Sequence, residues 1–104
     1  MLQTTGLGIE ALLLPKRSQI IEIAEKHGAF NIRVFGSVAR GEATPTSDVD
    51  FLIDYDSSRR SAWFPAGLIQ DLQMLLGRDV DVATMAMLRE DRGRDQVLAE
   101  AVML

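Results

Sequence analysis

The sequence has no cysteine and no long apolar run. Without cysteine, disulfide bonds, thiol chemistry and zinc or iron–sulfur sites with cysteine ligands are excluded. The longest apolar runs, such as 11–14, are far shorter than the roughly 20 residues of a membrane-spanning helix. No basic residue occurs in 1–10, so a secretory signal is not expected. We therefore expect a cytoplasmic protein that does not contact membranes.

The charge balance is acidic, because 15 Asp and Glu residues against 11 Lys and Arg residues give a net charge of −4. This sign opposes the neutralisation of phosphates, so direct binding of nucleic acid is not expected. Hydrophobic residues make up 47% of the chain and charged residues 25%, as in ordinary globular proteins rather than disordered ones. A length of 104 residues suits one domain, which we expect to span 1–104.

Hydrophobic periodicity predicts an alternation of helices and strands. Helices are predicted at about 15–27 and 65–76, and each is followed by a glycine, Gly28 or Gly77, that suits a left-handed stop residue. Strands are predicted, in chain order, at 31–35, 49–54 and 79–83. The remaining segments before residue 84 are predicted as one or two helical turns at 7–14, a short helix at 37–41, and polar loops at 42–47 and 55–61. This order favours an α/β domain with a small three-stranded sheet.

The C-terminal segment and three single residues carry further structural predictions. Residues 84–104 are predicted to form two short helices, with a fourth strand at 101–104 as an addition to the sheet. The residues of these helices expected to face inward are Met85, Leu88, Val97, Leu98 and Ala101. Trp63 and Phe64 are expected to pack the start of the helix at 65–76 onto the core. His27 is expected to interact favourably with the dipole at the end of the helix at 15–27.

Carboxylates on the predicted strands and a glycine turn indicate phosphate and metal chemistry. Asp48 and Asp50 are two residues apart, so on a strand their side chains point to the same face. Their repulsion is relieved by a divalent cation, and oxygen ligands favour Mg²⁺ or Mn²⁺. Gly36 and Ser37 lie at a strand-to-helix turn, where backbone N–H groups and the serine hydroxyl can bind an anion. With Asp81 on the next strand, the pattern is typical of metal-assisted phosphoryl or nucleotidyl transfer.

The segments Val34–Gly41 and Ser47–Asp50 resemble the Gly-Ser and Asp-x-Asp signature of the DNA polymerase β-like nucleotidyltransferase superfamily. Within this superfamily the chain is most similar to the minimal nucleotidyltransferase family, whose members act as antitoxins paired with HEPN-domain toxins. The resemblance covers about Ile20 to Ala101. It implies the polymerase β-like nucleotidyltransferase fold, in which a small mixed sheet of three to four strands is flanked by helices.

The resemblance also implies roles for individual residues. The implied sites are Gly36, Ser37 and Arg40 for the triphosphate, and Asp48, Asp50 and Asp81 for the metal ions and catalysis. Arg40 matches a position that is commonly basic in the family. Asp79 and Asp81 share a face of their strand, and only the setting of Asp81 between two valines favours it as the third carboxylate. Asp79 therefore stays open as an alternative.

The activity implied by the resemblance is transfer of AMP from ATP, with Mg²⁺ or Mn²⁺, to a hydroxyl group of a partner HEPN toxin. A tyrosine is the expected acceptor, and the chain is expected to form a hetero-oligomer with that toxin. A chain of this length has no residues left for a second, acceptor-binding domain, which favours a protein partner. The alternative is a non-catalytic antitoxin that neutralises its toxin by binding alone.

Overall fold

The computed structural model describes residues 6–88 and 93–104. In chain order the elements are α1 (Ile9–Leu12), η1 (Leu14–Lys16), α2 (Arg17–Lys26), β1 (Ala29–Phe35), α3 (Gly36–Ala39), β2 (Val49–Tyr55), α4 (Ala66–Leu76), β3 (Val80–Thr84), α5 (Met85–Leu88), α6 (Gly93–Glu100) and β4 (Val102–Met103). The predicted elements are therefore found, with boundaries that move by a few residues. In the described part of the chain, no helix is long and apolar enough to cross a membrane.

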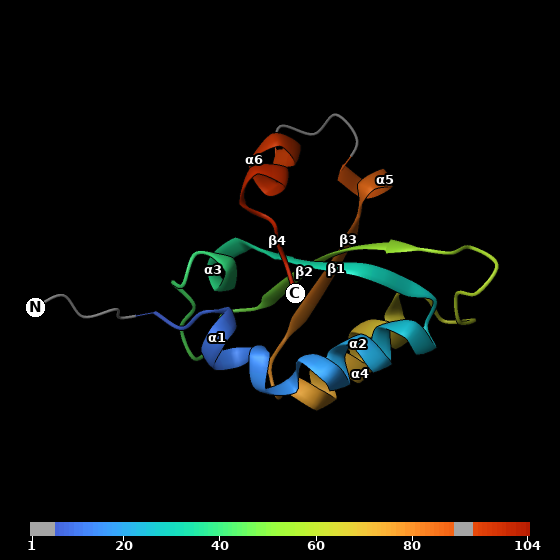
Figure 1. Cartoon of the computed structure of the whole chain (residues 1–104), viewed down its shortest axis with the longest axis horizontal. Coiled ribbons are helices and arrows are strands. Elements are labelled where there is room, and N and C mark those ends of the chain that lie inside the picture. The colour runs from blue at the N-terminus through green and yellow to red at the C-terminus, as the bar shows by residue number, and fades with distance from the viewer. Residues whose placement is uncertain (1–5, 89–92) are drawn as a thin grey trace, which may run out of the picture.

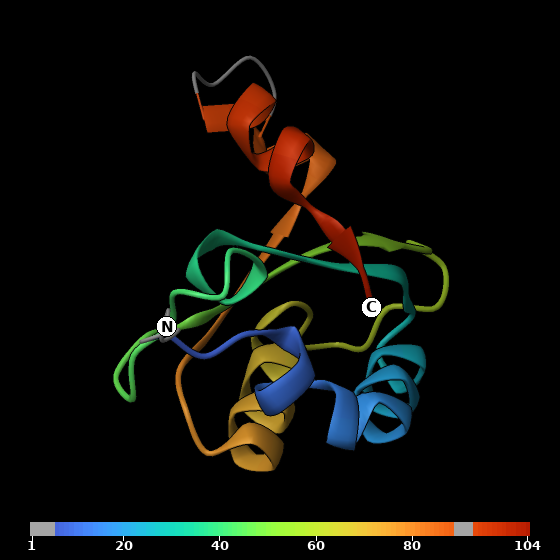
Figure 2. The same cartoon turned by 60° about the vertical axis from the view of Figure 1, so that its left-hand side comes forward.

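The four strands form one sheet in the order β3-β2-β1-β4. Strands β2 and β3 are parallel, with α4 as their crossover, whereas β1 runs antiparallel to both β2 and β4. Helices α2 and α4 lie together on one side of the sheet, and α5 and α6 lie on the other side (Figure 1; Figure 2). The mixed sheet and the fourth strand at 101–104 are thus confirmed.

Alternation along β2 divides the sheet into a core face and a second face. Val49, Phe51 and Ile53 are buried in the main hydrophobic cluster, together with residues of α2 and α4 such as Ile20 and Leu68. Leu52 is also fully buried, on the opposite face. Its neighbours two residues away on the same face, Asp50 and Asp54, are half-buried. The second face of the sheet therefore carries the polar residues of β2.

None of the predicted inward residues of the C-terminal helices is fully buried: Met85, Leu88, Val97 and Ala101 are half-buried, and Leu98 is exposed. Neither α5 nor α6 has a buried residue, and Leu98 is 39% exposed. The prediction is wrong for Leu98, and the other four residues are not fully buried because α2 and α4 already cover the core face of the sheet. The two short helices lie on its other side, and none of their residues belongs to the main cluster. Apolar spacing alone does not show that a helix has a surface to pack on.

The prediction for the aromatic pair before α4 is half wrong. Phe64 is half-buried and its ring packs on Tyr55 with 4.8 Å between centroids, whereas Trp63 is 79% exposed. The imidazole of His27 takes the space beside Gly67 in the first turn of α4, where a β-carbon on Gly67 would lie 3.1 Å from His27 Cε1. The His27 ring therefore packs against the start of α4, while the Trp63 side chain stays largely exposed.

His27, at the C-terminal end of α2, connects three segments of the chain. It is 6% exposed, and its Nδ1 lies 2.6 Å from Ser61 Oγ in the loop before α4. Its Nε2 lies 2.7 Å from Asp71 Oδ2 on α4. Hydrogen bonds from His27 and Lys26 hold the pKa of Asp71 below its ordinary value. The histidine thus fixes the loop to the two helices, a role beyond the expected interaction with the helix dipole.

We expect His27→Ala to lower the free energy of unfolding by about 2–4 kcal/mol, because it removes a buried ring and the hydrogen bonds to Ser61 and Asp71. Lys26→Ala is the matched control, because Lys26 also bonds Asp71, at 3.3 Å, but its side chain is 69% exposed. This control is expected to cost less than about 0.5 kcal/mol. Urea unfolding measures both values, and equal losses would contradict the structural role of His27.

Candidate active site

The register of the sheet brings three predicted site residues to one end of three neighbouring strands. Phe35, the last residue of β1, pairs with Asp50 near the start of β2. Asp50 in turn pairs with Asp81 near the start of β3. Gly36, which follows Phe35 and begins α3, therefore lies against Asp50. Backbone pairing alone sets the positions of the glycine and the two carboxylates.

Asp48 and Asp79 come just before the strands that carry Asp50 and Asp81. Asp48 is exposed and immediately precedes β2. Asp79 is also exposed, and its carbonyl oxygen accepts the Val49 N–H at 2.9 Å. Asp81, and not Asp79, is the register partner of Asp50. The pairing supports Asp81 as the third carboxylate of the predicted site.

Asp50 is the carboxylate whose surroundings change its acidity most clearly. Burial raises the pKa of Asp50 to about 6, and the negative charges of Asp81, Asp48 and Glu100 act in the same direction. The positive charge of Arg40 opposes this rise. The negative charge on Asp50 is thus unfavourable at neutral pH unless a cation approaches.

The stability of the metal-free protein is expected to fall as the pH rises through about 6. The folded state holds a proton on Asp50 more tightly than the unfolded chain does, so this contribution is complete below about pH 4 and is lost above about pH 6. Asp50→Asn is expected to remove this contribution to the pH dependence of the free energy of unfolding. At pH 7.5 it is expected to raise that free energy by about 1 kcal/mol, after allowance for solvent screening. Urea unfolding of both proteins at pH 4.5 and 7.5 measures these free energies. The same change between the two pH values in both proteins would contradict a raised pKa for Asp50.

Gly36 has a backbone conformation and a position that favour glycine. Its φ is +76°, in the left-handed region. A β-carbon on it would collide with Oδ2 of Asp50 and lie 3.2 Å from Cγ of the same residue. The absence of a side chain therefore lets the turn approach the Asp50 carboxylate. Ser37 is half-buried in α3 and no side chain caps this helix, so the serine is not its N-cap.

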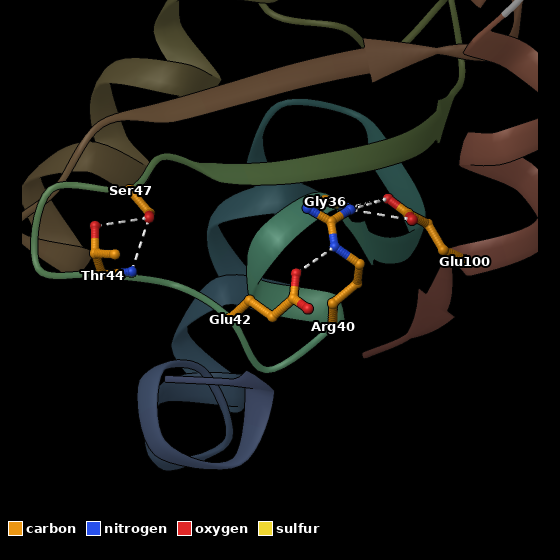
Figure 3. A network of polar contacts seen from close by, with 6 residues as sticks. All are labelled: Gly36, Arg40, Glu42, Thr44, Ser47 and Glu100. Carbon is orange, nitrogen blue, oxygen red and sulfur yellow. Dashed lines mark hydrogen bonds and ion pairs between the residues drawn. The ribbon is translucent and has the colours of Figure 1, made fainter. Parts of the chain in front are cut away.

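The backbone N–H of Gly36 already has an anionic partner, which sequence analysis missed. It donates a hydrogen bond of 2.7 Å to Oε1 of Glu100, the last residue of α6. Arg40 Nη1 lies 3.0 and 3.1 Å from the two oxygens of the same carboxylate, while its Nε bonds Glu42 at 2.9 Å (Figure 3). Two of the residues predicted to bind triphosphate thus hold a carboxylate of the same chain.

The loop before Asp48 is held by its own hydroxyls and by an arginine that sequence analysis did not select. Ser47 Oγ accepts the Thr44 N–H at 2.8 Å (Figure 3). Arg78, between α4 and β3, donates to the carbonyl oxygens of Thr44 and Ser47, both at 3.1 Å. These bonds fix the segment that leads into Asp48, so Arg78 is a positioning residue for the carboxylates.

The chemistry of the carboxylates fits a hard divalent cation, because all the donors are oxygen atoms on one corner of the sheet. Within 6–88 and 93–104, no group of three or more His, Asp or Glu side chains is gathered closely enough to hold a metal ion. Asp50 and Asp81 are adjacent in the register, and their charges repel. The fit to Mg²⁺ thus rests on donor type and strand pairing, and the three metal ligands remain a prediction.

Comparisons with known proteins give relatives of similar length. Residues 17–104 match the family model described as "Nucleotidyltransferase domain". The chain is 36% identical over 86 residues to "Putative protein adenylyltransferase MJ0435" of Methanocaldococcus jannaschii, which covers 83% of this chain and 90% of that protein. It is also 36% identical over 94 residues to "Protein adenylyltransferase MntA" of Thermococcus cleftensis, with 90% of each chain covered.

A solved structure shares the fold as well as the sequence pattern. It is described as "Structure of putative minimal nucleotidyltransferase", is 39% identical and superposes with a TM-score of 0.77, over 96% of this chain and 99% of that one. The family match covers both the Gly36 turn and the strands that carry the carboxylates. The fold expected from the Gly-Ser and Asp-x-Asp signature is therefore confirmed. The chain belongs to the nucleotidyltransferase domain family, as one of its minimal nucleotidyltransferases.

Proposed function

We propose that this nucleotidyltransferase transfers AMP from ATP to a hydroxyl group of a partner protein, and that the partner is a HEPN toxin modified on a tyrosine. Two relatives named protein adenylyltransferases support a protein as the acceptor. The observation that carries the proposal is the register that aligns Gly36, Asp50 and Asp81 at one end of the sheet. An anion-binding backbone and a carboxylate pair at one place suit the transfer of a charged nucleotidyl group.

In the proposed reaction the acceptor oxygen bonds to the α-phosphorus of ATP, and the bond from that phosphorus to the bridging oxygen breaks to release pyrophosphate. The N–H of Gly36, the hydroxyl of Ser37 and the guanidinium of Arg40 bind the oxygens of the triphosphate. The acceptor's proton passes to a carboxylate of the Asp48, Asp50 and Asp81 group, and from there to water. These residues orient the two reactants and balance the charge that develops between them.

A divalent cation, Mg²⁺ or Mn²⁺, is the proposed cofactor, and Asp48, Asp50 and Asp81 are its proposed ligands. When bound, such an ion stabilises the charge on the phosphates and lowers the pKa of the acceptor hydroxyl. Its positive charge would also offset the effect of burial and of the neighbouring carboxylates, which together raise the pKa of Asp50. Asp48 and Asp81 are exposed, which leaves this side of the site open to a residue from another protein.

The test is to express this chain with the protein encoded by the neighbouring reading frame, purify the complex and measure the intact mass of both chains. A toxin heavier by one or more AMP groups, only when ATP and Mg²⁺ are supplied, is the expected result. Tandem mass spectrometry then identifies the modified residue, which we expect to be a tyrosine. A toxin that is bound and neutralised but has an unchanged mass would favour the non-catalytic antitoxin and overturn the proposed transfer.

A further inference from the structure

Glu100 lies opposite Gly36 because of the pairing of the last strand. Val102 of β4 pairs with Val34 of β1, and the two strands are antiparallel. Continuing this register by two residues puts Glu100 beside Gly36, where the 2.7 Å hydrogen bond is found. The carboxylate is 20% exposed and also pairs with Arg40 (Figure 3). The strand pairing places the backbone of Glu100, and the contacts with Gly36 and Arg40 hold its carboxylate.

We propose that Glu100 is an internal competitor of the nucleotide, whose carboxylate occupies the phosphate-binding donors and must leave before a triphosphate can bind. This inference rests on the proposed function, since it takes the Gly36 N–H and the Arg40 guanidinium to be donors to phosphate. A carboxylate and a phosphate both present anionic oxygens that accept charge-assisted hydrogen bonds. The same donors cannot hold both groups at once.

The fold makes departure of Glu100 possible without disturbing the core. Helix α6 has no buried residue and contributes none to the main hydrophobic cluster. Strand β4 holds the end of the chain through its pairing with β1, through the bond from Leu104 N to Ile32 O at 2.9 Å, and through the bond from Arg17 to Leu104 O at 2.6 Å. Glu100 can therefore turn away while β4 stays in the sheet. The protein alternates between a closed site, with Glu100 bound, and an open site that accepts ATP.

Only the open fraction binds the nucleotide, so the closed state raises the apparent Kd. We expect Glu100→Gln and Glu100→Ala to lower the Kd for ATP in the presence of Mg²⁺ by about tenfold, a change of about 1.4 kcal/mol in binding free energy. Isothermal titration calorimetry on the full chain measures the Kd. Thermal unfolding of each variant confirms that the protein is folded at the temperature of the titration.

Glu42→Gln is the matched control. Glu42 also carries a negative charge bonded to Arg40, at 2.9 Å, but it is not the partner of the Gly36 N–H. Removing its charge changes the general attraction for a polyanion by a similar amount, and we expect the Kd to change less than about threefold. A tenfold tightening in the Glu42 variant as well would overturn the proposal, because the effect would then be one of net charge.

The remaining outcomes separate this inference from the proposed function. If Glu100 only anchors α6, its variants are less stable and bind ATP no more tightly than the parent protein, and the inference is wrong. If neither Glu100 variant binds ATP at all, it is wrong as well. If both variants bind ATP more tightly but never modify the partner protein, the internal competition stands and the proposed transfer fails.

Discussion

Replacing Asp48 and Asp50 together by Asn is expected to reduce nucleotidyl transfer by about 1,000-fold or more, while the protein keeps its fold. Asn retains the size of Asp but loses the charge that would hold a divalent cation. Neither side chain belongs to the hydrophobic cluster, and the charged form of Asp50 is disfavoured by burial and by its neighbours' charges. The metal-free double variant should therefore unfold at the same temperature as the parent protein or a higher one. Transfer of radiolabelled AMP to the partner, with circular dichroism on heating, measures both effects.

Single substitutions of the two aspartates on and before β3 resolve which of them acts with Asp50. Asp81→Asn is expected to lower transfer by about 100-fold, because Asp81 is the register partner of Asp50. Asp79→Asn carries the same change of charge two residues away, and we expect it to alter transfer less than about threefold. A larger loss of transfer in the Asp79 variant than in the Asp81 variant would assign the third carboxylate to Asp79. Full activity in the Asp48 and Asp50 double variant would overturn the site as a whole.

Gly36→Ala is expected to lower the free energy of unfolding by about 2–4 kcal/mol and transfer by about 100-fold. The left-handed backbone accounts for part of the loss of stability. The collision of the new β-carbon with the Asp50 carboxylate accounts for the rest, and it moves the group that is proposed to hold the cation. Urea unfolding and the AMP transfer assay measure the two effects separately.

Gly41→Ala is the matched control for this change. Gly41 has a φ of +72°, close to that of Gly36, but nothing lies within 4 Å of the β-carbon it would gain. Its variant should show only the backbone cost, about 1–2 kcal/mol, and should retain transfer. The difference between the two variants measures the contact between Gly36 and Asp50. If both lost activity equally, that contact would have no part in the reaction.

Local patterns in the sequence were sufficient to predict the elements, and they also carry the prediction of the carboxylates. The strand at 49–54 is visible as an apolar run between Asp50 and Asp54. Gly28 and Gly77 each follow a helix in the left-handed conformation, as expected. These features depend on residues close together in the chain. The Gly-Ser and Asp-x-Asp spacing depends on one turn and one strand, so it was also visible.

Features that depend on pairing between distant segments could not be predicted. Glu100 lies near Gly36 only because β4 pairs with β1 in one register, and no local pattern in α6 indicates that register. The partners of His27 come from a loop and a helix more than 30 residues away. Trp63 is predicted to pack because it comes just before the helix at 65–76, but its side chain is 79% exposed and the His27 ring packs beside Gly67. In each case the helix or strand was predicted, but the contacts of its side chains with distant segments were not.

The parallel pairing of β2 with β3 has a consequence for when the site arises during synthesis. After α1, η1 and α2, the ribosome releases β1, α3 and β2, and β1 and β2 can pair antiparallel as soon as both have emerged. Strand β3 can join β2 only after the whole of α4 has been made, because a parallel neighbour needs a crossover. Such distant pairings form slowly compared with local ones. A nascent chain that stops within α4 therefore has the glycine turn but lacks Asp81, so the proposed nucleotide site is completed late in translation.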